Sequence, residues 1–197
     1  MIAIVDYGAG NISSVKKALE HVQPESPVEV TNDPAVIATA DKLVMPGVGH
    51  FCRCEGLNLN LRPAVLEAIS RGTPFLGICV GMQWLFEGST EAPETPGAAL
   101  FPGQCSKFPS NVKSPHVGWN RIELCHESRL LRGIQDGSFV YYTHSFRAPM
   151  VEQTVAATQY GGTFSAAVER GNIFGAQFHP EKSGPTGLRI LENFCAI

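Results

Sequence analysis

The sequence has little of what several specialised protein classes need. Only 17% of its residues are charged, and 15 Lys and Arg against 18 Asp and Glu give a formal net charge of −3. It therefore lacks the basic excess with which a protein neutralises a phosphate backbone or an anionic lipid surface. It also has no apolar run near the ~18 residues of a membrane-spanning helix. We expect no nucleic-acid partner and no membrane association.

Cysteine is scarce as well, with six residues in 197. That number is too small for a disulfide-dense scaffold and indicates free thiols in a reducing compartment. The start, Met1 to Val5, has no basic flank and meets Asp6 at once, unlike a secretory signal. We expect a cytoplasmic protein. A chain of this length buries roughly 70% of its unfolded surface, so an ordinary globular core is feasible without cross-links.

Short apolar runs alternate with amphipathic segments in the first half of the chain. The predicted strands are Ile2 to Asp6, Val28 to Thr31, Leu43 to Met45 and Phe75 to Ile78. The predicted helices are Ile12 to Val22, Pro34 to Ala40 and Leu59 to Arg71. Buried strands joined by helices indicate a parallel sheet that is covered on both faces. A ligand is then expected at the carboxyl ends of the strands.

The second half is rich in Pro, Gly and Ser up to Pro115 and then strand-like. Strands are predicted near Arg121 to Leu124, Phe139 to Tyr142, Thr154 to Thr158, Ser165 to Val168 and Ile173 to Phe178, and a closing helix near Thr186 to Phe194. Arg170-Gly171-Asn172 fits a hairpin connection. The sequence predicts one α/β domain over residues 1–197, a mostly parallel sheet flanked by helices with an antiparallel β extension in the C-terminal half.

The stretch Gly77-Ile78-Cys79-Val80-Gly81 follows a predicted buried strand. Two flanking glycines make room for a tight strand-to-helix turn that projects a nucleophile above the sheet, here a cysteine. A lone cysteine at a strand end is more often a small buried hydrophobe. The glycines at the right offsets favour Cys79 as a nucleophile.

A thiolate that attacks an acyl carbon needs a base and an orienting carboxylate. His179-Pro180-Glu181 supplies both, 100 residues downstream of Cys79. Residues i and i+2 of an extended segment point to the same side, so His179 and Glu181 are predicted to lie side by side, with Pro180 ending the strand. The alternative is a surface turn in which the three residues occur together by chance.

Pro46-Gly47-Val48-Gly49 ends the third predicted strand. Its glycines allow backbone N–H groups to turn toward a developing oxyanion, beside the Val80 N–H. The same residues are also common in ordinary loops. In a parallel sheet this loop shares a rim with Cys79.

Two other patterns point to weaker hypotheses. Cys52 and Cys54 with His50 lack the second ligand pair of a structural zinc site, so we expect no metal. Gly8-x-Gly10 is half of a dinucleotide fingerprint, but Ser13 stands where the third glycine belongs. We interpret it as a tight strand-to-helix turn and expect no cofactor.

Together these motifs resemble the class I glutamine amidotransferases, whose glutaminase domains carry a Cys-His-Glu triad on a flavodoxin-like core. Further stretches, in order along the chain, look like the glutaminase subunits of imidazole glycerol phosphate synthases. They are Asp6 to Asn11, Pro46 to Phe51, Gly81 to Glu87, Pro115 to Asn120, Tyr142 to Phe146 and Phe178 to Ser183.

The resemblance implies hydrolysis of L-glutamine to glutamate and ammonia. The ammonia would pass to a (β/α)8-barrel cyclase subunit, in a heterodimer that makes imidazole glycerol phosphate and aminoimidazole carboxamide ribotide in histidine biosynthesis. Cys79 would be the nucleophile, His179 the base and later the acid, and Glu181 the orienting group.

The resemblance also implies roles for further residues. The oxyanion hole would use the N–H groups of Val80 and Gly49, with a flip of the Val48-Gly49 peptide. The residues implied to hold glutamine are Gly47, Gln83, Glu91, Ser145 and Phe146. Those implied at the partner interface and ammonia exit are Asn11, Trp119, Asn120, Tyr141 and Lys182.

Alternatives remain open at this point. The chain could be a glutaminase of another amidotransferase, a flavodoxin-like binding module in which Cys79 is inert, or a cysteine peptidase. Cys52, Cys54, Val80 and Trp84 depart from the usual family pattern and bear on local packing more than on chemistry.

Overall fold

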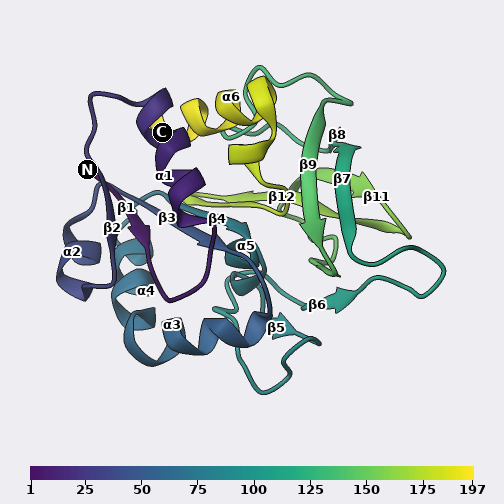
Figure 1. Cartoon of the computed structure of the whole chain (residues 1–197), viewed down its shortest axis with the longest axis horizontal. Helices are drawn as coiled ribbons and strands as arrows, with labels where there is room; N and C mark the ends of the chain where they lie inside the picture. Colours follow the sequence, from purple (N-terminus) through teal and green to yellow (C-terminus); the bar gives the residue numbers. More distant parts are fainter.

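An eight-stranded sheet forms the centre of the computed structural model, which describes all 197 residues (Figure 1). Its strand order is β2-β1-β3-β4-β13-β12-β11-β8. The strands are β1 Ile2–Val5, β2 Val28–Thr31, β3 Lys42–Gly47, β4 Phe75–Cys79, β8 Glu123–Leu124, β11 Thr154–Gln159, β12 Thr163–Arg170 and β13 Ile173–Ala176. The first five in spatial order pair in parallel, and β12, β11 and β8 continue antiparallel. The predicted fold class is confirmed.

Helices cover both faces of this sheet. They are α1 Ile12–Val22, α2 Pro34–Thr39, α3 Cys54–Asn60, α4 Arg62–Ser70, α5 Val80–Trp84 and α6 Gly184–Cys195, with 3-10 turns η1 Phe51–Arg53 and η2 Pro180–Lys182. Helices α1 and α6 lie against each other on one side, and α3 and α4 lie on the other (Figure 1). Helix α1 buries Val15, Ala18 and Leu19, which share one face at the 3-to-4 spacing of an amphipathic helix.

Local sequence explains where several elements begin and end. Asp33 caps α2, because its carboxylate accepts a hydrogen bond from the Ala35 N–H at 2.8 Å. The β12–β13 hairpin turns at Gly171 and Asn172, between the paired residues Arg170 and Ile173, as the sequence predicted.

Two predicted elements were wrong in extent. The predicted helix Leu59 to Arg71 is two helices, α3 and α4, which meet at Leu61. Pro63 lacks the N–H that would continue α3 and fits the first turn of a new helix. The predicted strand to Phe178 ends at Ala176, because the chain then leaves the sheet and the His179 N–H donates to the Tyr141 carbonyl at 2.9 Å.

Two smaller sheets form the rest of the antiparallel extension. One has the order β10-β6-β5, from β5 Gly88–Ser89, β6 Gln104–Lys107 and β10 Phe146–Arg147. The other pairs β7 His116–Arg121 with β9 Phe139–His144 and stands across the end of the main sheet (Figure 1). The sequence predicted neither β5 nor β6, and it placed a strand at Arg121 to Leu124 where β7 ends and β8 begins.

The hydrophobic core is continuous and contains 53 buried residues from both halves of the chain. A core that joins the halves is what one domain over residues 1–197 requires. None of the helices has the length and apolarity needed to cross a membrane.

An aromatic cluster between the β7–β9 pair and the main sheet contains two buried histidines. The His116 ring stacks on Tyr160, with centroids 3.9 Å apart, and His144 lies 5.1 Å from the Phe108 ring. Burial lowers the pKa of His116 to about 4 and that of His144 to about 3. Both imidazoles are therefore neutral at physiological pH.

Neutral buried histidines predict a loss of stability in acid. The unfolded chain binds protons at these imidazoles below about pH 6.5, while the folded chain does not, so the stability that they confer falls from pH 6.5 toward pH 4. Between pH 7.5 and pH 5, the unfolding temperature of the native protein should fall by about 3–5 °C more than the unfolding temperature of His116→Gln. Thermal unfolding followed by circular dichroism measures this difference.

The matched control is His21→Gln, which removes an exposed histidine. It should keep the full acid sensitivity of the native protein. Equal acid sensitivity in His116→Gln and the native protein would contradict the neutral state of His116.

Candidate active site

Cys79 stands on a strained turn between β4 and α5. Its backbone φ is +56°, a conformation that L-residues rarely adopt. The turn is tight because α5 starts directly against β3: a Cβ on Gly81 would lie 1.9 Å from the Met45 carbonyl oxygen, and one on Gly77 would lie 2.4 Å from that of Gly81. Both positions require glycine, and the predicted strand-to-helix turn is confirmed.

The sheet brings His179 to Cys79. Strand β13 pairs in parallel with β4, with Gly175 opposite Gly77 and Ala176 opposite Ile78, so the chain leaves both strands at the same rim. The His179 Nδ1 lies 2.8 Å from Glu181 Oε1, and both side chains are almost inaccessible to solvent. The predicted pair forms, but Glu181 belongs to the 3-10 turn η2 and not to an extended segment.

Charge around His179 favours its protonated form. Burial by itself lowers the pKa of His179, but the Cys79 sulfur and the Glu181 carboxylate outweigh it and raise the pKa to about 10. Glu181 occupies Nδ1, and the buried Nε2 makes no hydrogen bond of ordinary length. Nε2 is therefore the nitrogen left to exchange a proton beside the sulfur. An imidazolium in this place stabilises a thiolate.

A cavity of about 260 Å³ opens beside Cys79. Its lining is Gly49, Cys79, Val80, Gln83, Glu91, Pro115, Thr143, His144, Ser145 and Phe146. It is smaller than the ~300–1,000 Å³ of common ligand sites, a size that suits an amino acid better than a peptide chain. Six of the residues predicted for the oxyanion hole and the glutamine contacts lie here, whereas Pro115, Thr143 and His144 were not foreseen.

The Gly47–Gly49 segment reaches this cavity only at its end. Gly49 has φ +92° and lines the cavity, while Val48 faces a neighbouring hollow together with Arg53. Gly47 is buried in β3 opposite Cys79, and a Cβ there would lie 2.5 Å from the Tyr7 hydroxyl. Gly47 therefore contributes close packing beneath Cys79 and is not part of the cavity wall.

Amide groups connect the cavity wall to the sulfur. Gln83 Nε2 donates to the Phe146 carbonyl at 2.8 Å and to Gln177 Oε1 at 3.2 Å, and Gln177 Nε2 lies 3.8 Å from Cys79 Sγ. Glu91 Oε2 accepts from the Phe51 N–H at 2.8 Å. Sequence reasoning missed Gln177. Its position two residues before His179 could have indicated it, because residues i and i+2 of an extended segment point to the same side.

Four of the five residues predicted for the partner interface lie around the triad. Trp119 and Tyr141 are opposite each other on β7 and β9, with ring centroids 6.0 Å apart, and Asn11 Nδ2 donates to Glu181 Oε1 at 3.4 Å. Lys182 is exposed directly after Glu181. Asn120 is on the other face of β7 from Trp119.

Asn120 Nδ2 donates to the Gln159 carbonyl at 3.1 Å and lies 3.3 Å from His116 Nε2. Asn120 thus points into the aromatic cluster. Its side chain points away from Trp119, with which the resemblance had grouped it at the partner interface.

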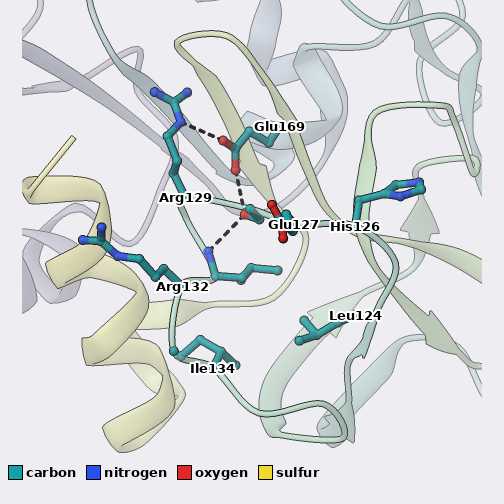
Figure 2. A pocket seen from close by; sticks show the side chains of 10 residues that line it. Leu124, His126, Glu127, Arg129, Arg132, Ile134 and Glu169 are labelled. Atoms are coloured by element: carbon teal, nitrogen blue, oxygen red, sulfur yellow. Dashed lines mark hydrogen bonds and ion pairs between the residues drawn. The ribbon is translucent and has the colours of Figure 1, made fainter.

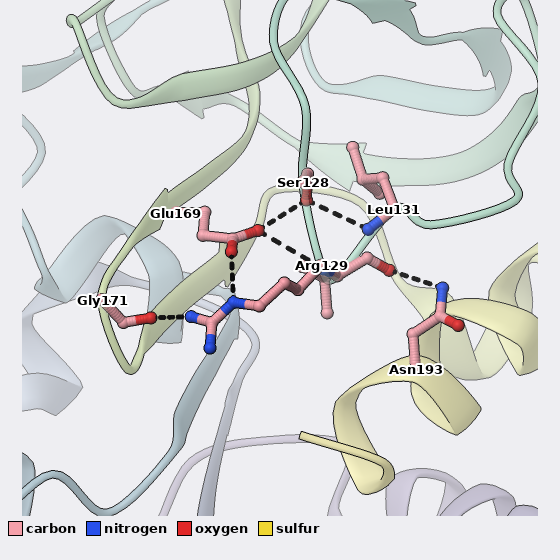
Figure 3. Close-up of polar contacts among 7 residues, drawn as sticks. Ser128, Arg129, Leu131, Glu169, Gly171 and Asn193 are labelled. Atoms are coloured by element: carbon pink, nitrogen blue, oxygen red, sulfur yellow. Dashed lines mark hydrogen bonds and ion pairs between the residues drawn. The ribbon is translucent and has the colours of Figure 1, made fainter.

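The largest cavity, about 580 Å³, is elsewhere, between residues 124–134 and Glu169 (Figure 2). Its polar groups are already paired: Glu169 accepts from Arg129 Nε at 3.0 Å and from Ser128 Oγ at 2.6 Å, and Arg129 also donates to the Gly171 carbonyl (Figure 3). Asn193 of α6 donates to the Leu130 carbonyl at 3.0 Å. These bonds fasten the loop to the β12–β13 hairpin and α6. No predicted site residue lies here.

Cys52 and Cys54 differ in their surroundings. Cys52 is exposed, whereas Cys54 is buried, and burial raises the pKa of its thiol to about 12. No three His, Cys, Asp or Glu side chains lie together in the arrangement that a metal ion needs.

Comparison with known proteins shows the family of the chain. The sequence profile of the family described as Glutamine amidotransferase class-I matches residues 3–197. Imidazole glycerol phosphate synthase subunit HisH of Thermococcus kodakarensis is 45% identical over 200 residues, covering 98% of each chain. HisH of Bacillus mycoides is 46% identical, covering 100% of this chain and 95% of its own.

A crystal structure of a glutamine amidotransferase superposes with a TM-score of 0.76 at 16% identity, covering 100% of both chains. At that identity it supports the fold alone. The family profile and the full-length relatives show the family as well. The chain belongs to the class-I glutamine amidotransferase family and, within it, to the HisH subunits of imidazole glycerol phosphate synthase.

Proposed function

We propose that the protein hydrolyses L-glutamine to glutamate and ammonia, and delivers the ammonia to the cyclase subunit of imidazole glycerol phosphate synthase in histidine biosynthesis. The observation that carries this proposal is the strained Cys79 beside the buried His179–Glu181 pair, at the wall of an amino-acid-sized cavity. The two full-length HisH relatives add the pathway.

The proposal gives each of these residues a chemical step. Cys79 Sγ attacks the side-chain amide carbon of glutamine, and the oxygen becomes an oxyanion. The Val80 N–H, first in α5, has no helical carbonyl to donate to and is free to bind this oxyanion. A flip of the Val48-Gly49 peptide would turn the Gly49 N–H to the same oxyanion. His179 Nε2 protonates the departing nitrogen, and ammonia leaves a thioester on Cys79.

Water then hydrolyses the thioester. His179, now neutral, takes a proton from the water, and glutamate leaves as Cys79 is restored. Glu181 holds Nδ1 throughout, so that Nε2 keeps facing the reacting atoms. Gln83, Glu91, Ser145 and Phe146 line the remainder of the cavity and hold the amino-acid portion of the substrate.

An exposed aromatic surface supports a proposal for the side on which the partner binds. Val117, Trp119 and Phe139 are each about half exposed and lie on one face of the β7–β9 pair, beside Tyr141. Exposed Trp and Tyr side chains are typical of protein interfaces. We place the (β/α)8-barrel cyclase subunit on this surface in a heterodimer. Six free cysteines fit a cytoplasmic complex.

The nucleophile is tested by Cys79→Ala. Glutamate release, assayed with the cyclase subunit and its ribonucleotide substrate, should fall at least about 1,000-fold, because no other group can form the thioester. Cys125→Ala, which removes an exposed cysteine, is the matched control and should keep full activity. Hydrolysis that survives in the folded Cys79→Ala protein would exclude the mechanism.

The orienting carboxylate is tested by Glu181→Gln. Removing its charge lowers the pKa of His179, so the alkaline limb of kcat/KM against pH should move to lower pH, and kcat should fall by about 100-fold or more. Glu192→Gln, at an exposed position of α6, should change neither. An unchanged pH profile in Glu181→Gln would argue against this role.

The partner surface is tested by Trp119→Ala. Calorimetric titration with the cyclase subunit should show Kd increased by about 10-fold or more, since a central Trp commonly carries much of the binding energy. Leu59→Ala, which removes a 74% exposed leucine on α3, should bind normally. If the native chain did not bind the cyclase at all while still hydrolysing glutamine, the pathway assignment would fail and the chemistry would stand.

A further inference from the structure

A continuous series of polar groups, made of side chains and one backbone carbonyl, runs from Cys79 to strand β7. It begins with the contacts of Gln177 and Gln83 described above and meets the Phe146 carbonyl. That carbonyl also accepts from His144 Nδ1 at 2.8 Å. His144 Nε2 lies 3.3 Å from His116 Nδ1, and His116 Nε2 lies 3.3 Å from Asn120 Nδ2. The mechanism above uses neither histidine and does not use Gln177.

The directions of all these hydrogen bonds are fixed by their partners. A carbonyl can only accept, so both Gln83 and His144 present an N–H to Phe146. The same NH2 group of Gln83 also donates to Gln177, so Gln177 accepts this bond with its side-chain carbonyl oxygen. The NH2 group of Gln177 is then left for Cys79. Neutral His144 donates from Nδ1, accepts at Nε2 from His116, and His116 accepts from Asn120.

Gln177 is fully buried, and its Nε2 lies 3.8 Å from Cys79 Sγ. We propose that Gln177 is a further catalytic residue, whose amide N–H stabilises the Cys79 thiolate, and that His144 is a positioning residue that fixes the direction of that amide through Phe146 and Gln83. This inference rests on the proposed function, since it takes Cys79 as the nucleophile.

The physical reason is the sign of the amide dipole. A buried N–H aimed at a sulfur atom favours the negative thiolate, whereas a carbonyl oxygen in the same place would oppose it. If the side-chain amide of Gln83 were rotated by a half turn, its oxygen would face the Phe146 carbonyl oxygen, and two acceptors repel each other. The side-chain amide of Gln177 would then have to rotate as well. The bond from His144 holds that carbonyl in place. Because Gln83 also lines the cavity, the same chain links substrate binding to the sulfur.

The test is the pH dependence of Cys79 alkylation by iodoacetamide, followed by mass spectrometry on the full chain. In Gln177→Leu the midpoint should move up by about half to one pH unit, because the N–H that favours the thiolate is gone. In Gln177→Glu, of nearly the same shape, the added negative charge should move it up further. The second variant decides the matter if the first does not fold.

Asn193→Leu is the matched control. Asn193 is also a buried amide, and its N–H groups donate to the Leu130 and Arg132 carbonyls, away from the site. It should lose stability without any shift of the alkylation midpoint. Folded Gln177 variants with the native alkylation profile would overturn the inference.

The same assay distinguishes a failure of the proposed function from a failure of the role proposed for Gln177. If Cys79 of the native chain reacts no faster than exposed Cys125 at any pH, the proposed function itself is wrong. If Cys79 reacts selectively but the Gln177 variants match the native profile, only the role of Gln177 is wrong.

His144 is tested by a pair of substitutions. His144→Asn keeps an N–H near the position of Nδ1, while His144→Phe keeps the ring shape and loses the donor. With the cyclase present, kcat/KM for glutamine should stay within about 3-fold of native in the first variant and fall by about 10-fold or more in the second. The alkylation midpoint should move only in the second. Equal losses in both would overturn the positioning role.

Discussion

The parallel pairing of β13 with β4 is the constraint on which the active site depends. Cys79 and His179 are 100 residues apart in the chain, and this pairing makes both strands end at one rim of the sheet. A shift of register by one residue would turn every side chain of β13 to the other face. Close packing opposes such a shift, since all four β13 residues are buried and a Cβ in place of Gly175 would lie 2.7 Å from Met82 Cγ.

Close packing under the nucleophile is the second requirement. Helix α5 starts so near β3 that Gly77 and Gly81 leave no room for a Cβ, and the turn forces Cys79 to a positive φ. Such strain persists only where the surrounding structure holds it. The buried residues of β3, β4 and α5 supply that support, so the stability of the core holds the sulfur at the cavity wall.

The antiparallel half adds what a parallel sheet alone does not provide. Strands β7 and β9 present aromatic side chains to solvent on one face and bury two neutral histidines behind the other. The segment after β13 bonds to β9 through the His179 N–H and the Tyr141 carbonyl. The proposed partner surface and His179 are thus parts of one hydrogen-bonded unit.

Features with a local physical cause follow from short stretches of the chain. Gly77, the Asp33 cap and the Gly171-Asn172 hairpin are each required by backbone geometry within a few residues, so they can be predicted from the chain alone. The need for Gly81 comes instead from the Met45 carbonyl oxygen of β3. The pairing of His179 with Glu181 was also predicted, but its geometry was not, because Glu181 reaches His179 from a 3-10 turn and not from an extended segment. The tertiary structure decided which distant side chains share a face or a hydrogen bond. The orientation of Asn120 away from Trp119, the burial of Gly47 and the contact of Gln177 with the sulfur all depend on strands that meet only in the folded protein, and no local pattern encodes them.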